Sequence, residues 1–155
     1  SGVAHVCALA GYEVIITDTS EKTINKALQN IGHNIDRQIT RGHVDQKKKL
    51  TALTRLNPVK NLEAFETVGL VIEAATENEE IKRSILSKLC PILSPETYIV
   101  SSSSTISITK LGAQTNRPDK VIGMHFMNPV PIMKLVEVIK GSLTSNETVD
   151  FILDY

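Results

Sequence analysis

The chain has 155 residues, of which 41% are hydrophobic and 22% are charged. These are values of a folded domain and not of a disordered segment. Its 17 basic and 17 acidic residues balance, so charge gives no reason to expect nucleic acid or an anionic membrane as a partner. No apolar run reaches the roughly 18 residues needed to cross a bilayer. Cys7 and Cys90 are too few for a disulfide framework and fit buried, reduced thiols. Together these features predict one soluble domain of a reducing compartment.

The first sixty residues alternate between helical and extended patterns. Apolar residues at helical spacing start at the first positions, and a glycine then gives a typical helix stop signal. A short β-branched run follows, and after it comes a long segment with apolar residues every three or four positions. The predicted elements are a helix ending at Gly11, a strand at 13–17, a helix capped at Thr19-Ser20 and broken by Gly42, a lysine-rich helix at 45–56, and a turn at Asn57-Pro58.

From residue 70 onward, short apolar strands alternate with amphipathic helices. The predicted elements are strands at 70–72, 98–100, 121–123 and 135–139, and helices at 78–93, near 107–114, and from Ser145 onward. This alternation predicts an α/β fold with a doubly wound, mostly parallel sheet covered by helices on both faces. Ligands bind beyond the carboxyl ends of such strands. Polar residues collect at those ends, at Asp18, 73–77, 101–105 and 124–128.

The segment from Gly123 to Glu137 holds the strongest candidate site. His125 follows an apolar run, and a histidine with an ordinary pKa of ~6.5 can exchange a proton near neutrality. Glu137 lies among apolar residues, so its carboxylate needs either a partner or a proton. His125 is the obvious partner. On residue types alone, a satisfied loop histidine and a surface glutamate remain an open alternative.

Asp18 is a candidate cofactor contact. A carboxylate at the end of a strand that follows a helix fits the residue that binds the adenosine ribose in a dinucleotide fold, and it favours NAD over NADP. A helix-capping aspartate is the open alternative. The glycine-rich fingerprint that would decide between them, G-x-G-x-x-G, is absent from this chain. We therefore expect the first strand and the phosphate loop to be missing at the N-terminus.

With these pieces in order, the sequence resembles the L-3-hydroxyacyl-CoA dehydrogenases, in particular the short form that includes bacterial 3-hydroxybutyryl-CoA dehydrogenases. The resemblance covers essentially the whole chain. The stretches that carry it are 6–12 (Val-Cys-Ala-Leu-Ala-Gly-Tyr), 71–78 (Val-Ile-Glu-Ala-Ala-Thr-Glu-Asn), 104–109 (Ser-Thr-Ile-Ser-Ile-Thr) and Gly123 through Gly141.

The resemblance implies a Rossmann-like NAD-binding domain, here N-terminally truncated, followed in the family by a helical domain that forms a homodimer. It implies reversible NAD-dependent oxidation of (3S)-3-hydroxyacyl-CoA in fatty acid or butanoate metabolism, with no metal. The expected location is the cytoplasm, with the mitochondrial matrix as the alternative. Without the first strand and the helical domain, the 155-residue piece alone is expected to be inactive and poorly stable.

The resemblance also implies roles for particular residues. His125 would be the catalytic base, Glu137 would orient its ring, and Ser104 would contact the substrate oxygen and the nicotinamide ribose. Asn128 would bind near the nicotinamide and the substrate. The remaining implied contacts are Asp18, Glu77 and Lys82 to NAD, and Asn34 and Arg41 to the CoA portion. For Lys82, a plain solvated helix face is the open alternative.

The sequence departs from the family pattern in places. Ser102 stands where an asparagine is usual, which leaves the loop geometry in doubt, and Met127 replaces a usual phenylalanine. His5, His33 and His43 match no catalytic position and are interpreted as ordinary surface or core residues. Three alternatives stay open: a dehydrogenase segment of a multifunctional β-oxidation protein, a non-catalytic relative, and an enzyme for free 3-hydroxy acids.

Overall fold

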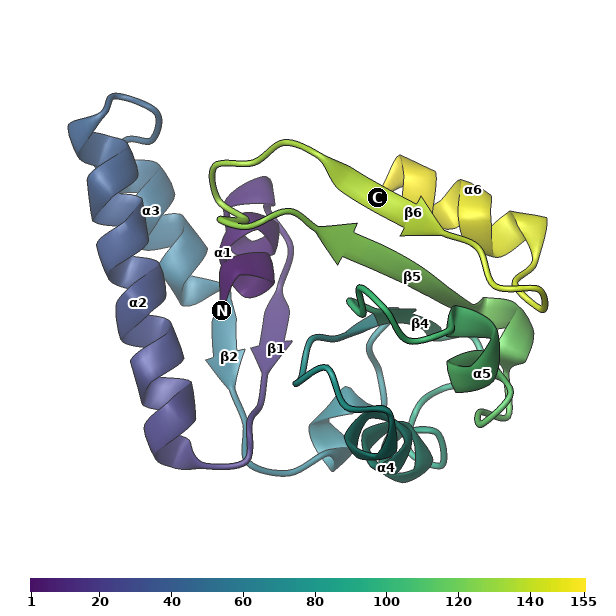
Figure 1. Cartoon of the computed structure of the whole chain (residues 1–155). Helices are drawn as coiled ribbons and strands as arrows, with labels where there is room; N and C mark the ends of the chain where they lie inside the picture. Colours follow the sequence, from purple (N-terminus) through teal and green to yellow (C-terminus); the bar gives the residue numbers. More distant parts are fainter. The chain divides into compact units, whose positions relative to one another are not determined.

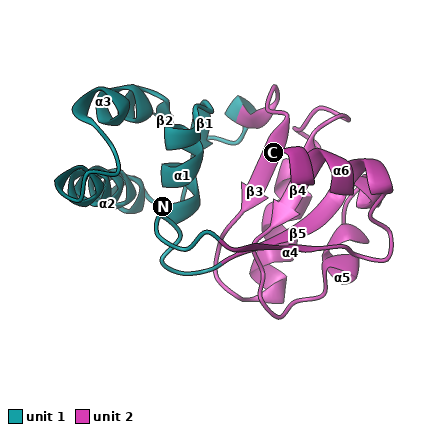
Figure 2. Cartoon of the chain, turned by 90° about the horizontal axis from the view of Figure 1, so that it is seen from above, with its two compact units in different colours: residues 1–64, 127–134 teal, residues 65–126, 135–155 magenta.

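A computed structural model describes all residues of the chain, 1–155, and it divides into two compact units (Figure 2). Unit 1 comprises residues 1–64 and 127–134. Unit 2 comprises residues 65–126 and 135–155. The helices and most of the strands are labelled in Figure 1, and β3 is labelled in Figure 2.

Unit 1 packs helices around a small parallel sheet. Its elements are α1 (Gly2–Ala10), β1 (Val14–Ile16), α2 (Glu21–Thr40), α3 (Gln46–Thr54), β2 (Leu56–Pro58) and a 3-10 turn beginning at Glu63. β1 and β2 run parallel, with Val14 opposite Leu56. The core of this unit consists of Ala8, Ile31, Ile35, Ala52 and Leu56. One apolar stripe from each helix therefore meets at the strands, as the helical spacing predicts.

Local sequence signals set the ends of these helices. Gly11 ends α1 in the left-handed conformation, with φ of 112°, which costs a glycine little because it has no Cβ. The Ser20 side chain caps α2 by accepting a hydrogen bond from the Thr23 amide. Asp45 caps α3 in the same way through the Lys48 amide. Such caps satisfy amide groups that have no partner within the helix.

Unit 2 is built on a four-stranded sheet in the order β3-β4-β5-β6. Its elements are β3 (Leu70–Glu73), α4 (Glu79–Leu89), β4 (Tyr98–Ser101), α5 (Ile108–Gly112), a 3-10 turn (Pro118–Lys120), β5 (Val121–Phe126), β6 (Val136–Ile139) and α6 (Asn146–Asp154). β3, β4 and β5 are parallel, and β6 pairs antiparallel with β5.

The two faces of this sheet carry different side chains. One face is apolar throughout and packs against α6, through Val100, Ile122, Met124 and Ile152. The other face lies toward α4 and α5 (Figure 1), where Ile108 of α5 reaches Gly123. On that second face the residues change from Val71, Ile99 and Val121 to Glu73, Ser101 and Gly123 along the parallel strands. The polar positions therefore gather at the carboxyl ends of the strands.

A buried arginine binds the segment that connects α4 and β4 in unit 2. Arg117 is 5% exposed, and its guanidinium donates to the backbone carbonyls of Cys90, Leu93, Ser94 and Thr97. These carbonyls lie in the segment between α4 and β4, which Arg117 therefore holds in place. Cys90 and Cys7 are both buried, and neither forms a disulfide, as predicted. None of the helices combines the length and apolar character that a membrane span requires.

The α/β class and the parallel strands are confirmed. The strands form two sheets and not the single sheet that was expected, the helix predicted at 45–56 ends at Thr54, and three further details were wrong. Asn57-Pro58 is not a turn but part of β2; proline is tolerated there because the strand is short and ends at that residue. The strand predicted at 121–123 runs on to Phe126, so His125 lies in the sheet and not in a loop. The helix predicted at 78–93 ends at Leu89.

Candidate active site

The centre of the site is a cross-strand pair on β5 and β6. His125 stands directly opposite Glu137 in the antiparallel register, and its Nδ1 lies 2.8 Å from Glu137 Oε2. A carboxylate can only accept a hydrogen bond, so Nδ1 carries a hydrogen and the lone pair of the neutral ring is on Nε2. The predicted partnership is confirmed. Glu137 differs from the expected buried carboxylate because its side chain is 52% exposed, against 27% for His125.

Ser104 completes a chain of three side chains. It lies in the loop after β4, and its Oγ is 2.9 Å from His125 Nε2. Since Nε2 holds the lone pair, the serine hydroxyl donates this bond. The order Ser104–His125–Glu137 therefore places a basic nitrogen between a hydroxyl and a carboxylate. The arrangement can take a proton from an alcohol at Nε2 and stabilise the resulting imidazolium through Nδ1.

Glu77 holds the serine loop. Its Oε1 accepts four hydrogen bonds: from the Ser103 hydroxyl at 2.5 Å, the Ser104 amide at 3.0 Å, the Thr105 amide at 2.8 Å and the Thr105 hydroxyl at 2.9 Å. The Ser103 hydroxyl, followed by the groups of Thr105 and Ser104, lowers the pKa of Glu77 to about 2. Hydrogen bonds to the charged form favour it, so Glu77 is ionised at neutral pH.

A second carboxylate, Glu73, is buried beneath this loop. Lys82 Nζ lies 2.9 Å from both Glu73 oxygens, and the lysine is fully buried. The Ser101 hydroxyl and the Ala75 amide also donate to Glu73. The alternative of a solvated helix face for Lys82 was therefore wrong, because its ammonium faces the interior of unit 2. Its contact in this structure is Glu73, and a role in lining the cofactor site stays a prediction.

A shallow hollow lies beside this site. It has a volume of about 310 Å³ and borders Ser104, Thr105, Ile139 and Gly141. A larger hollow of about 670 Å³ involves Gly69 and Thr97, at the opposite ends of β3 and β4. That one borders neither His125 nor Ser104, whereas the smaller hollow borders Ser104 but not His125. No group of three or more His, Cys, Asp or Glu side chains could hold a metal ion.

Asp18 in unit 1 fits a ribose-binding carboxylate. It is exposed and is separated from the end of β1 by Thr17 alone, and its Oδ1 accepts from the adjacent Thr19 amide and hydroxyl. The helix-capping alternative was wrong, because Ser20 caps α2. A solvent-facing carboxylate at the carboxyl end of a parallel strand can accept hydrogen bonds from a ribose diol.

The other predicted binding residues also lie in unit 1. Asn34 is half-buried on α2, and Arg41 is exposed at its end. Asn128 is exposed in the loop after β5. The structure brings together Ser104, His125, Glu137 and Glu77 within unit 2, and the roles of Asn34, Arg41 and Asn128 stay predictions.

The sequence interpretation missed a polar relay in unit 1. His5 is fully buried, and its Nε2 lies 3.0 Å from Gln38 Oε1, while Gln38 Nε2 donates to the Pro131 carbonyl. The relay thus ties α1 and α2 to the loop that carries Asn128. The sequence does contain a signal for Gln38. It lies one helical turn after Asn34 and one before Arg41, so it shares the helix face of these two predicted binding residues.

Comparison with known proteins identifies the family of this chain. All 155 residues match the profile of a family described as 3-hydroxyacyl-CoA dehydrogenase, NAD binding domain. A 3-hydroxybutyryl-CoA dehydrogenase from Bradyrhizobium diazoefficiens is 44% identical over 148 residues, which are 96% of this chain and 50% of that protein. A fatty acid oxidation complex subunit alpha from Idiomarina loihiensis is 34% identical, over 99% of this chain and 21% of that protein.

Solved structures agree in fold. The crystal structure of (S)-3-hydroxybutyryl-CoA dehydrogenase from Ralstonia eutropha matches with a TM-score of 0.96 and 38% identity, over 99% of this chain and 54% of that one. The chain thus spans about half the length of the dehydrogenases that it matches.

Proposed function

The chain belongs to the 3-hydroxyacyl-CoA dehydrogenase family, as its NAD-binding domain, and from this premise we propose that the full-length protein oxidises (3S)-3-hydroxyacyl-CoA reversibly to 3-oxoacyl-CoA. The observation that carries the proposal is the hydrogen-bonded order Ser104–His125–Glu137. A purely structural domain has no need for a basic nitrogen held between a hydroxyl and a carboxylate at an exposed strand end.

His125 acts as the base in this proposal. Its Nε2 takes the proton of the substrate's 3-hydroxyl, and in the reverse direction it returns that proton to the 3-oxygen. Glu137 accepts the Nδ1 hydrogen at 2.8 Å, so it fixes the tautomer and stabilises the imidazolium. Ser104 gives up its bond to Nε2 when the substrate hydroxyl arrives and then binds the 3-oxygen. A positioned acid–base group of this kind contributes about 10²–10⁴-fold.

NAD is the cofactor of this domain and, when bound, supplies the acceptor for the hydride that leaves C3. Asp18 would hold the adenosine ribose, because its carboxylate is exposed and serves no cap. Glu77, Ser104 and Asn128 would line the nicotinamide end. Asn34 and Arg41 would contact the CoA portion, where a guanidinium suits a phosphate.

The substrate class is tested with the full-length protein. We expect NADH formation from (S)-3-hydroxybutyryl-CoA and none from free (S)-3-hydroxybutyrate at the same concentration, because the free acid lacks the CoA contacts. Equal rates on both compounds would contradict the thioester assignment. A second candidate, the dehydrogenase segment of a multifunctional protein, is supported by the 34% identical relative. The length of the parent chain separates the two, because a fused protein also carries a hydratase.

For the full-length protein we further propose a homodimer and a cytoplasmic location. The resemblance to the short-form dehydrogenases, which implies a dimer-forming helical domain, supports the first point, and about half of the Bradyrhizobium and Ralstonia enzymes lies outside the region matched by this chain. Light scattering after gel filtration tests it, and a monomer at micromolar concentration would contradict it.

A further inference from the structure

We propose that Glu77 is a positioning residue that sets the geometry of Ser104 against His125. The inference rests on the proposed function, in which Ser104 and His125 meet the reacting oxygen. It differs from the expected role of Glu77 as a cofactor contact, because the carboxylate acts here through the chain itself.

A single oxygen atom of Glu77 accepts several hydrogen bonds. Oε1 of Glu77 accepts from four donors, all of them in residues 103–105. The Glu77 side chain is on the surface, in the loop after β3. An exposed glutamate ordinarily keeps its rotamer freedom, and ordering it costs entropy. Four bonds to one oxygen therefore mark a carboxylate that organises the loop facing it.

The donors to Glu77 lie on both sides of Ser104 in the chain. The bonded donors come from Ser103, from the Ser104 amide itself and from Thr105, so both neighbours of the reactive serine are held. Ser103 is 2% exposed, and its hydroxyl also accepts from the Ile106 amide at 2.9 Å. The hydroxyl can donate to Glu77 and accept from Ile106 at once, because it has one hydrogen and two lone pairs. The backbone is thus fixed on each side of the residue whose Oγ lies 2.9 Å from His125 Nε2.

The negative charge of Glu77 strengthens its bonds to the loop. A neutral carbonyl oxygen has two lone pairs and binds four donors poorly, whereas an ionised carboxylate makes stronger, charge-assisted bonds. Glu77 keeps its charge down to acidic pH because these same donors lower its pKa. The Glu77→Gln variant keeps an oxygen in place but loses the charge, so it loosens the loop without removing the side chain.

The loop that carries Glu77 is itself bonded to Glu73 at the end of β3. Ala75, two residues earlier, donates its amide to the buried carboxylate of Glu73 at 2.7 Å. The Ser102 amide donates to the Glu73 carbonyl at 2.9 Å. The loops after β3 and β4 are therefore joined at two levels, by Glu73 at the strand ends and by Glu77 further out. The bonds to Glu73 keep the strand ends in place. A shift of the Glu77 carboxylate therefore moves the loop residues around Ser104 and not the strands.

The test is a double-mutant cycle in the full-length protein, with Glu77→Gln and Ser104→Ala made singly and together. If Glu77 acts through Ser104, Glu77→Gln lowers kcat about 10- to 100-fold when Ser104 is present, as misplacement of a reacting group does. In the Ser104→Ala background the same change costs less than about twofold, because no serine remains to be positioned. Equal losses in both backgrounds would overturn the inference.

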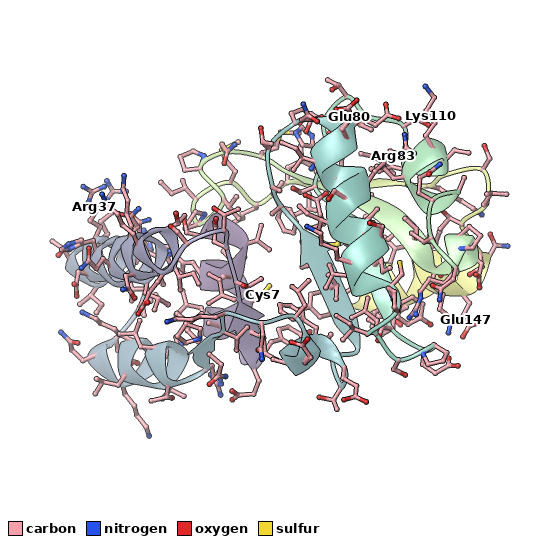
Figure 3. The ribbon with its side chains drawn as sticks, turned by 90° about the horizontal axis from the view of Figure 1, so that it is seen from below. Cys7, Arg37, Glu80, Arg83, Lys110 and Glu147 are labelled. Atoms are coloured by element: carbon pink, nitrogen blue, oxygen red, sulfur yellow. The ribbon has the colours of Figure 1, made fainter.

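Ser103→Ala separates positioning from cofactor contact. It removes one donor to Glu77 and leaves the carboxylate in place, so we expect a smaller fall in kcat with an unchanged Kd for NAD. The matched control is Glu80→Gln, an exposed glutamate in the first turn of α4 (Figure 3). It removes the same charge without touching residues 103–105, and we expect kcat to stay within about twofold of wild type.

A spectroscopic readout keeps this inference distinct from the proposed function. In protein labelled with ¹⁵N-histidine, Glu77→Gln moves the Nε2 resonance of His125 toward its position in Ser104→Ala, whereas Glu80→Gln leaves it in place. An unmoved resonance in Glu77→Gln overturns the inference even if the enzyme oxidises the thioester. If the wild-type protein oxidises no thioester, the proposed function fails, and the resonance still decides whether Glu77 positions Ser104.

Discussion

Replacing Lys82 with methionine removes the cation that neutralises Glu73 inside unit 2. Lys82 is fully buried and Glu73 is 4% exposed, so water cannot replace the lost partner. The carboxylate keeps two donors, the Ser101 hydroxyl at 2.9 Å and the Ala75 amide at 2.7 Å. It loses the two bonds of 2.9 Å from the ammonium. The variant therefore contains a buried charge with half of its hydrogen-bond donors.

The size of the loss follows from the distance. At an effective dielectric constant of ~20, two charges 2.9 Å apart attract by about 6 kcal/mol. Part of this is recovered because the ammonium no longer has to be desolvated, and removing one partner of a buried pair costs about 3–5 kcal/mol in practice. A domain is stable by only about 5–15 kcal/mol. Lys82→Met should thus lower the free energy of unfolding by about 3–5 kcal/mol.

Urea unfolding followed by far-UV circular dichroism measures this change, since the chain has no tryptophan to report by fluorescence. The double variant Glu73→Gln/Lys82→Met removes both charges and should regain more than half of the loss. Arg83→Met is the control, because Arg83 is exposed on the same helix (Figure 3). The reasoning is refuted if Lys82→Met unfolds within about 1 kcal/mol of wild type, or if the double variant is no more stable than the single one.

Two further predictions concern packing and pH. Gly123→Ala should lower the free energy of unfolding by about 1–3 kcal/mol, because its Cβ would lie 2.9 Å from Ile108 Cδ1 and 3.0 Å from Ile139 Cβ. Gly69→Ala is the control, since a Cβ at this position has nothing within 4 Å. Equal urea midpoints for the two variants would refute the packing argument. Burial lowers the pKa of His5 in the folded chain. The contribution of neutral His5 to the stability is therefore complete above the ordinary histidine pKa of ~6.5. It is lost as the pH falls below that value, because the unfolded chain then binds the proton more readily than the folded chain. Thermal midpoints between pH 7.5 and 5.5 should fall less in His5→Gln than in wild type, whereas His33→Gln, at an exposed position, should match wild type; an equal pH slope in His5→Gln would contradict this.

Features that depend on neighbouring residues could be predicted from the sequence. The periodicity of α2 and α4 and the capping serines of α2 and α6 are local signals. α2 and α6 formed where they were expected, and α4 began there but ended at Leu89. The His125–Glu137 partnership could also be predicted from the two residue types, but the burial on which the prediction relied was wrong, since the Glu137 side chain is 52% exposed. The strand ends were harder, since β5 is prolonged by pairing with β6, a contact that no local pattern encodes.

Features that depend on distant partners could not be predicted from the residues. Lys82 looks like a surface lysine until Glu73, nine residues earlier, is placed beneath it. Glu77 finds its donors 26 to 28 residues later, and two of the four are backbone amides, which every sequence has. β2 was missed because a three-residue strand containing proline has no recognisable pattern and forms only when β1 pairs with it.

The most direct test of the proposed chemistry is the turnover of His125→Gln in the full-length protein with (S)-3-hydroxybutyryl-CoA and NAD. Glutamine fills much of the same volume but has no basic nitrogen to take the proton of the 3-hydroxyl. We predict that kcat falls by at least about 100-fold, while the Kd for NAD, measured by calorimetry, stays close to that of wild type. Undiminished turnover in this variant would contradict the assignment of His125 as the base, and with it the proposed function of the Ser104–His125–Glu137 chain.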